Sequence, residues 1–307
     1  MDAQFKELST CRLCDDSTLK IERKIGEFPI TRCQSCGFLQ TGKVLDEAEI
    51  NRRYEDDYGG ERMQQGQIVN APVNLHLLEK SVTLSAQTKV LDVGCGYGFF
   101  LKAVKDKYKA EVTGVELAKA EVDFARDTLG INVLSSLEGL PKHAFDVICM
   151  FEVIEHIAKP KEFLEEVITL LKPGGKLLIV TDNFSAPIVR NMGNHFPKWI
   201  PHQHISLFEG PTLTKLMQSL PEFSITSRYA FTPWELVAKG WVYKLTGGRK
   251  GASHFSLNHE LSTEASRPYP LFKLRKTLNK YWVRLALRKN LKGEIMCITA
   301  QSPKGSE

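Results

Sequence analysis

The 307-residue sequence lacks any apolar run that approaches the roughly 20 residues needed to cross a bilayer. Residues 1–5 also lack the basic and apolar pattern of a signal peptide. Strong charge of one sign is missing too, because the formal net charge is only +5. So weak a basic balance does not by itself indicate nucleic-acid binding. We therefore expect a soluble, cytoplasmic protein of one large domain or two smaller ones, without nucleic acid as a partner.

The seven cysteines of a cytoplasmic chain are better explained as metal ligands and buried thiols than as disulfides. Four of them form two C-x-x-C pairs, Cys11 with Cys14 and Cys33 with Cys36. Each pair places two thiolates on one tight turn, and two such turns supply the four ligands of a tetrahedral zinc site. We expect a structural Zn²⁺ site in a zinc ribbon over residues 1–42. Two unrelated redox or free-thiol pairs are the alternative.

A glycine-rich turn follows the apolar run at 90–93, with Gly94, Gly96 and Gly98 at alternate positions and a helical pattern after them. This pattern predicts a buried strand that turns into a helix, where glycines let a ligand approach the backbone. The third glycine comes one residue earlier than in the dinucleotide-binding motif, and Asp92 precedes the turn, where a pyrophosphate would be repelled. A carboxylate there suits a ligand with an ammonium group and a ribose, such as S-adenosylmethionine (SAM).

The next motifs follow in order along the chain. Residues 111–116 form a predicted strand that ends in Glu116, whose carboxylate can accept hydrogen bonds from ribose hydroxyls. Another buried strand at 145–151 precedes an E-x-x-E-H motif at 152–156, and residues 171–175 are expected to close a helix before a strand at 176–180. Over residues 86–182 these motifs resemble the class I SAM-dependent methyltransferases, in particular the branch that carries E-x-x-E-H after the fourth strand.

The resemblance implies an α/β fold with a Rossmann-like seven-stranded sheet, formed by residues 86–231 and 293–303. It makes residues 43–85 a helical cap or linker and residues 232–292 an insertion before the last strand. It also places the adenine contact at Ser136 and Leu137, although this family usually has an Asp where Ser136 stands. The cofactor-binding residues that it implies are Asp92, Gly94, Cys95, Gly96, Gly98, Glu116, Leu117, Ser136, Leu137, Phe151 and Glu152.

Two predicted helices precede the core, one at 47–54 and one that begins at Asn74. In related methyltransferases such helices lie over the cofactor, and a tyrosine from them often approaches it. Tyr54 and Tyr58 are the candidates for that contact. Packing of both tyrosines on the ribbon is an equal alternative.

Histidines supply the candidate catalytic base. Methyl transfer to a hydroxyl requires removal of its proton, and an imidazole can accept a proton near neutral pH. His156 follows a strand at the edge where ligands bind in open α/β sheets. His202 and His204 lie in the segment 182–210, which we expect to form a lid over the acceptor. In one alternative, His156 only caps the next helix or supports the loop. In another, two histidines bind a metal together with Asp182.

The C-terminal part contains a strand at 223–229 that is expected to pair with a strand at 293–300. Between them, residues 271–292 carry eight Lys or Arg and no acid. Apolar residues recur there at helical spacing, which predicts a basic amphipathic helix; they are Leu271, Leu274, Leu278, Trp282 and Leu285. Such a helix can contact an anionic membrane surface or a phosphorylated substrate, or it can pack on its own domain with a solvated basic face.

The ribbon, the E-x-x-E-H core and the histidine segment together are similar to bacterial methyltransferases of sugar, polysaccharide and natural-product pathways. We therefore expect O-methylation of a small-molecule or glycan-type acceptor. An RNA-modifying enzyme that uses the ribbon and the basic helix to hold nucleic acid is a second hypothesis. A non-catalytic SAM-binding scaffold is a third.

Overall fold

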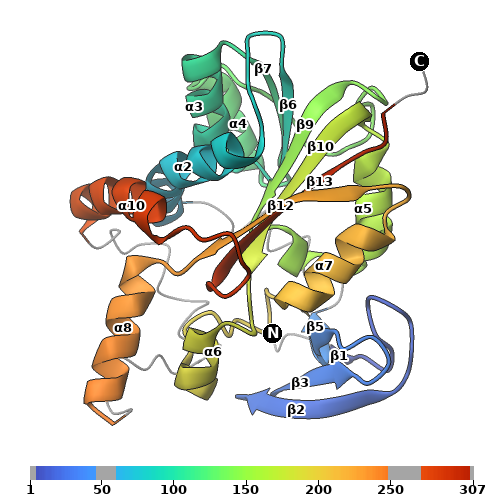
Figure 1. Cartoon of the computed structure of the whole chain (residues 1–307), viewed down its shortest axis with the longest axis vertical. Coiled ribbons are helices and arrows are strands. Elements are labelled where there is room, and N and C mark those ends of the chain that lie inside the picture. Colours follow the sequence, from blue (N-terminus) through green and yellow to red (C-terminus); the bar gives the residue numbers. More distant parts are fainter. Residues whose placement is uncertain (1–4, 46–59, 248–270, 305–307) are drawn as a thin grey trace.

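The larger part of the protein is an α/β unit built on a seven-stranded mixed sheet (Figure 1). The computed structural model describes residues 5–45, 60–247 and 271–304. The strands of the sheet are β6 (Lys89–Val93), β7 (Glu111–Val115), β8 (Asn132–Leu134), β9 (Phe145–Phe151), β10 (Leu171–Asp182), β12 (Ser224–Phe231) and β13 (Ile295–Gln301). Their order is β12-β13-β10-β9-β6-β7-β8, and β13 alone runs antiparallel to both of its neighbours. The predicted seven-stranded sheet is therefore confirmed.

Helices cover both faces of this sheet because its parallel strands are apolar on both sides. Neighbouring residues alternate between the faces, so that Leu91 and Ile148 join one buried cluster while Val90 and Val147 join the other. The face of Val90 is covered by α2 (Glu61–Ser81), α3 (Phe99–Tyr108), α4 (Lys119–Asp127) and α10 (Phe272–Ala286). The opposite face is covered by α5 (Pro160–Ile168) and α7 (Gly210–Ser219).

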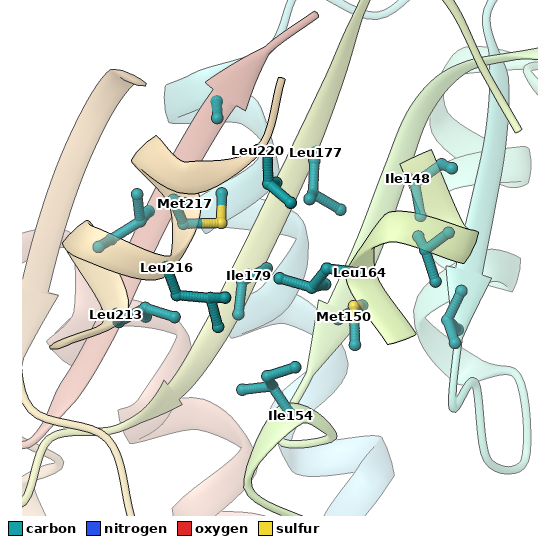
Figure 2. Packing of buried hydrophobic residues seen from close by; sticks show 14 of the residues in the cluster. Ile148, Met150, Ile154, Leu164, Leu177, Ile179, Leu213, Leu216, Met217 and Leu220 are labelled. Carbon is teal, nitrogen blue, oxygen red and sulfur yellow. The ribbon is translucent and has the colours of Figure 1, made fainter. Parts of the chain in front are cut away.

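Figure 2 shows the packing under α5 and α7, where Leu164 and Leu216 lie over Met150 and Ile179 of the sheet. All four side chains are almost completely buried. This cluster holds β9 and β10 in place, and these are the strands whose carboxyl ends lead into the E-x-x-E-H motif and into Asp182.

Strand β6 lies at the centre of the sheet, with β7 on one side and β9 on the other. The chain first adds strands on the β7 side and then crosses to the β9 side. In open α/β sheets ligands bind at the carboxyl ends of the strands at such a reversal of order. The glycine turn after β6 and Glu152 after β9 both lie at this position.

The N-terminal residues form small antiparallel sheets. Strand β1 (Phe5–Glu7) pairs with β5 (Lys43–Leu45), and β2 (Leu19–Ile25), β3 (Phe28–Cys33) and β4 (Leu39–Thr41) pair in sequence. A fourth strand joins β4 from the methyltransferase-like part, namely β11 (Ser206–Leu207). The ribbon predicted from the cysteines therefore shares a sheet with the segment that follows His204.

Two predicted element boundaries are wrong. Helix α2 begins at Glu61 and not at Asn74, because its first turns are polar and carry no apolar period that would mark them. Strand β10 begins at Leu171, so the segment 171–175 opens a strand and does not close a helix. The left-handed Gly174 (φ 76°) accompanies a shift in register within that strand. The predicted helix at 47–54, with Tyr54 and Tyr58, lies outside the described residues.

The segment expected to form a lid is folded against the ribbon. It contains α6 (Pro187–Met192), the 3₁₀ helix η2 (Gly193–His195) and a buried aromatic group with Phe184, Phe196 and Trp199. Helix α8 (Trp234–Leu245) follows β12, and α10 packs on α2. Within the described ranges, no helix has both the length and the apolar character to span a membrane.

Candidate active site

The turn after β6 requires its glycines. Gly94, Gly96 and Gly98 have φ values of 77°, 54° and 80°, which side chains rarely adopt. A Cβ atom at Gly94 would overlap Val153, and one at Gly96 would overlap the side chain of Gln67. The turn therefore brings bare backbone to the edge of the sheet.

Asp92 lies beneath this turn and is 3% exposed. Its Oδ1 atom has no hydrogen-bond partner in the described part of the chain. Burial, together with the nearby negative charge of Glu116, raises the pKa of Asp92 well above its ordinary value. Buried polar atoms are normally paired. A cationic group of a ligand, such as the ammonium of SAM, would supply the missing partner.

Glu116, at the end of β7, faces the same turn. Its Oε2 accepts a hydrogen bond from the Gly96 N–H (2.9 Å), and its Oε1 accepts from the N–H groups of Leu117 and Ala118 (2.8 and 3.0 Å). Gln67 of α2 crosses over the turn, and its Oε1 accepts a hydrogen bond from the next backbone N–H, that of residue 97 (2.8 Å). Gln67 was not predicted, because it lies in the polar first half of α2.

A cavity of about 2220 Å³ extends along the carboxyl ends of the strands. Of the predicted cofactor residues, only Gly98 lies outside its lining; it is the N-cap of α3. The other predicted residues that line the cavity are Asp92, Gly94, Cys95, Gly96, Glu116, Leu117, Ser136, Leu137, Phe151, Glu152, His156, His202 and His204. The structure thus brings the candidate donor and acceptor residues to one cavity, and their individual roles stay predictions.

The candidate bases lie on two segments that meet across this cavity. His156 ends the 3₁₀ helix η1 (Ile154–His156), and its Nδ1 is 3.1 Å from the carbonyl oxygen of Gln203. The ring of His204 stands edge to face against that of His156, with centroids 5.0 Å apart. The Nδ1 of His204 is 3.6 Å from Oδ2 of Asp182, at the end of β10. Neither of these two atoms has a hydrogen-bond partner among the described residues.

A half-buried lysine lies among the acids beside His204. The Nζ of Lys198 is 2.5 Å from Asp182, 2.9 Å from Glu294 and 3.4 Å from Glu152. Burial acts to lower the pKa of Lys198, but the three carboxylates outweigh it and raise the pKa well above the ordinary value. Burial raises the pKa of Glu294 to about 8. This cluster was not predicted, because Glu294 directly precedes β13 and is far from the other members in sequence.

Comparison with known proteins identifies the family. A family model described as a methyltransferase domain matches residues 67–220. A ubiquinone biosynthesis O-methyltransferase of Coxiella burnetii is 34% identical over 173 residues, which cover 52% of this chain and 72% of that protein. The chain belongs to the SAM-dependent methyltransferases.

Further relatives agree with this assignment. The ubiquinone biosynthesis O-methyltransferase of Idiomarina loihiensis is 33% identical over 151 residues, or 43% of this chain and 60% of that protein. Among solved structures, a SAM-dependent methyltransferase of Thermotoga maritima has a TM-score of 0.50 at 17% identity and covers 83% of this chain and 95% of its own. A chain from the complex of the Haloferax volcanii Trm112 activator with a methyltransferase has a TM-score of 0.51 at 15% identity. This match covers 83% of the present chain and 98% of the other. These two likenesses show the fold alone.

The pKa values of the two candidate bases, His156 and His204, are both lowered. Burial, followed by the nearby His156, lowers the pKa of His204 well below its ordinary value. Burial also lowers the pKa of His156. A neutral imidazole has a free lone pair and can accept a proton, whereas an imidazolium cannot. Both rings are therefore in the protonation state that a base requires.

In the described part of the methyltransferase, two groups of side chains have the composition of a metal site. The ligand atoms of Glu155, His156 and His204 lie within 4.8 Å of one another. This set differs from the predicted one, because Glu155 takes the place expected for Asp182. Glu155 Oε2 already accepts a hydrogen bond from Thr181 (2.8 Å). The second group is the cluster of Cys11, Cys14, Cys33 and Cys36, whose sulfur atoms also lie within 4.8 Å of one another.

Arg12, inside the first C-x-x-C turn, also lines the cavity. Its buried Nε and Nη1 atoms have no hydrogen-bond partner in the described ranges. Burial lowers the pKa of Arg12 to about 10, which leaves it charged at neutral pH. Its backbone N–H donates to Oε1 of Gln40 (2.8 Å), and Gln40 pairs with Ser206 between β4 and β11. The ribbon therefore presents a cation to the cavity from a turn that is tied to the strand after His204.

Proposed function

We propose that the methyltransferase transfers a methyl group from SAM to a hydroxyl of a small-molecule or glycan-type acceptor, with His204 as the base. The observation that carries this proposal is His204, which lines the cavity that also contains the glycine turn and whose Nδ1 lies 3.6 Å from the carboxylate of Asp182. The two curated relatives are O-methyltransferases by name, which supports oxygen as the methylated atom.

SAM, when bound, supplies an electrophilic methyl group on a sulfonium. The residues of the glycine turn fit such a donor because Asp92 offers an unpaired carboxylate oxygen for its ammonium group. Glu116 can exchange its backbone hydrogen bonds for ribose hydroxyls, and Ser136 with Leu137 would border the adenine. Phe151 contributes an apolar surface between these polar contacts.

The base is His204. A small closure of the 3.6 Å gap would let its Nδ1–H donate to Oδ2 of Asp182, as catalytic hydrogen bonds often tighten when substrate binds. Nε2 would then carry the lone pair that removes the acceptor hydroxyl proton. Lys198 pairs with Asp182 (2.5 Å), and the carboxylate of this pair would stabilise the resulting imidazolium. His156 and His202 border the same cavity and would orient the acceptor.

The charge of Arg12 further restricts the acceptor. A guanidinium with buried, unpaired N–H groups is costly unless an anion joins it. None of its N–H groups donates to a cysteine sulfur or to a carboxylate of the described residues. A carboxylate or phosphate group on the acceptor would pair with Arg12, which favours sugar phosphates, uronic acids and hydroxybenzoates over neutral acceptors.

Release of S-adenosylhomocysteine from SAM with a panel of acceptors tests this function. The panel pairs each acidic acceptor with a neutral analogue and includes short RNA, and mass spectrometry locates the added methyl group. We expect methylation on oxygen, with the acidic member of a pair preferred and that preference lost in Arg12→Gln. Methylation of RNA alone would contradict the proposal. SAM binding without turnover on any member would favour a scaffold.

Zinc is the metal that best fits the four-cysteine cluster. The Sγ–Sγ distances of Cys11 to Cys36 and of Cys14 to Cys33 are both 3.6 Å. The edge of a tetrahedron of thiolates around Zn²⁺ is about 3.8 Å for Zn–S bonds of 2.3 Å. Four thiolates leave no open position for a substrate, so the ion would be structural.

Loss of this zinc is expected to reduce turnover as well as ribbon stability. The N–H of Thr41 donates to the Ile205 carbonyl (3.1 Å) and its Oγ1 to the His204 carbonyl (3.1 Å), so β4 holds the base in place. We expect Cys33→Ser to lose bound zinc, to raise hydrogen exchange in both residues 5–45 and the His204 segment, and to retain SAM affinity. Metal analysis, hydrogen exchange and calorimetry measure these effects.

Cys297→Ser serves as the matched control, since Cys297 is buried in β13 outside the cluster. It should keep zinc and turnover. Loss of zinc from Cys33→Ser with unchanged exchange around His204 would show that the ribbon does not support the base.

A further inference from the structure

The outer sides of α8 and α10 concentrate the exposed apolar side chains of the protein. Both helices lie at the same side of the molecule (Figure 1, orange to red). Ten large apolar side chains are exposed in the described ranges, and eight of them are on or next to these helices; they are Trp241, Val242, Leu245, Leu271, Leu274, Leu278, Tyr281 and Leu285. Exposed apolar residues are usually scattered singly, so a concentration on two neighbouring helices indicates a contact surface.

The exposed residues of α10 form one stripe. At 3.6 residues per turn, the four leucines and Tyr281 fall within about 80° of the helix circumference. Another side of α10 packs on the protein, where Val283 is fully buried, and Trp282, at the edge of the stripe, donates its Nε1–H to the Thr232 carbonyl (2.8 Å). Of the predicted apolar stripe, only Trp282 turns inward. Helix α10 therefore packs on its own domain with a solvated basic sector, while the leucines of the predicted stripe stay exposed.

Exposed basic residues share α10 with this stripe. Lys273, Lys276, Lys280 and Arg284 are exposed on a separate sector that begins about 60° round the helix from the stripe, and residues 271–292 contain no acid. On α8, Lys244 is exposed beside the apolar face of Trp241 and Leu245. Two hydrogen-bonded or ionic contacts join the helices where they meet, Trp234 with Asn279 (2.7 Å) and Arg275 with Glu235 (3.6 Å). These contacts fix α8 and α10 relative to each other.

We propose that this surface, the outer sides of α8 and α10, docks on an anionic lipid bilayer. Exposed leucines and a tryptophan insert into the interface of a bilayer, and neighbouring lysines and arginines bind its anionic headgroups. A second copy of the chain fits less well. A symmetric dimer through this surface would oppose the basic sector of one copy to that of the other, with no acid in residues 271–292 to compensate.

Sedimentation of the full-length protein with vesicles tests the proposal. We expect binding to vesicles of phosphatidylcholine mixed with phosphatidylglycerol, and much weaker binding to phosphatidylcholine alone. Reversing three charges in Lys273→Glu/Lys280→Glu/Arg284→Glu should lower the partition coefficient for the mixed vesicles by about 100-fold or more. None of these residues lines the cavity, so SAM binding should stay unchanged and report that the variant is folded.

A matched control changes the net charge by the same amount elsewhere. Three exposed lysines are suitable, namely Lys20 on β2, Lys142 just before β9 and Lys215 on α7. The triple Glu variant at these positions should retain most of the vesicle binding. An equal loss in both triple variants would mean that net charge alone attracts the protein, and this would overturn a specific surface.

The apolar stripe is tested separately. Leu274→Ser/Leu278→Ser/Leu285→Ser should weaken vesicle binding even at low salt, since the inserted groups are lost while the charges remain. The fluorescence of Trp241 should shift to the blue when anionic vesicles are added, and Trp241→Phe should remove that shift. No binding of the unaltered protein to anionic vesicles would overturn the proposal, as would a dimer in solution that the serine variant abolishes.

Discussion

Replacing Asp92 by Asn is expected to weaken SAM binding by about 100-fold, because the buried carboxylate is the candidate partner of the cofactor's ammonium group. The substitution keeps the shape of the side chain and removes its charge. Without cofactor, the variant should be at least as stable as the original protein, since a buried carboxylate with an unpaired oxygen opposes folding. Calorimetry with SAM and chemical unfolding without it measure the two effects.

The gain in stability should depend on pH. The pKa of Asp92 is raised in the folded protein, so the folded state holds this proton more tightly than the unfolded chain does. The contribution of Asp92 to the free energy of unfolding is therefore greatest in acid and is lost as pH rises from about its unfolded value of 3.8 through the folded value. Asn does not titrate, and the advantage of Asp92→Asn should grow from acid to neutral pH.

Asp123→Asn is the matched control, because Asp123 lies on the exposed side of α4 and pairs with Lys119. It should change neither SAM affinity nor its pH dependence. Unchanged SAM affinity in Asp92→Asn, with a folded protein, would mean that the cofactor is held elsewhere and would remove the central step of the site assignment.

Local patterns in the sequence were sufficient to place the donor side of the site. A strand, its glycines and Asp92 lie within nine residues of one another, roughly the length of one strand-to-helix turn, so their geometry is fixed by the backbone that they share. The same holds for the two C-x-x-C turns. Gln67 was not predicted because it reaches the turn from a separate helix, and the first turns of that helix show no helical spacing of apolar residues.

The acceptor side depends on contacts between distant segments, and these could not be derived from spacing. Lys198 meets Glu294 only because β13 runs antiparallel beside β10 and brings its first residues to Asp182. The ribbon supports His204 only because Ser206 and Leu207, which follow it closely, form strand β11 and pair with β4. The stripe of leucines on α10 was visible in the sequence, but its outward direction follows from the way Val283 packs.

Removal of the imidazole in His204→Ala is expected to lower kcat by about 10²–10⁴-fold, the usual contribution of a positioned base, while SAM affinity is retained. Asp182→Asn should give a smaller loss of kcat, because it keeps the imidazole and removes only the carboxylate that orients it. In the unaltered protein the pKa of His204 lies well below its ordinary value. Turnover should therefore stay level across neutral pH and fall only on the acid side of the usual histidine range.

His143→Asn is the control, because it removes a histidine that lies outside the cavity and whose Nδ1 is 3.1 Å from the Leu171 carbonyl. Asn also tolerates the left-handed backbone there (φ 53°). Its turnover should be unchanged. If His156→Ala abolishes turnover and His204→Ala does not, the base is His156. If Mg²⁺ restores turnover after chelation, the histidines with Glu155 are metal ligands, since Mg²⁺ does not replace zinc among four thiolates.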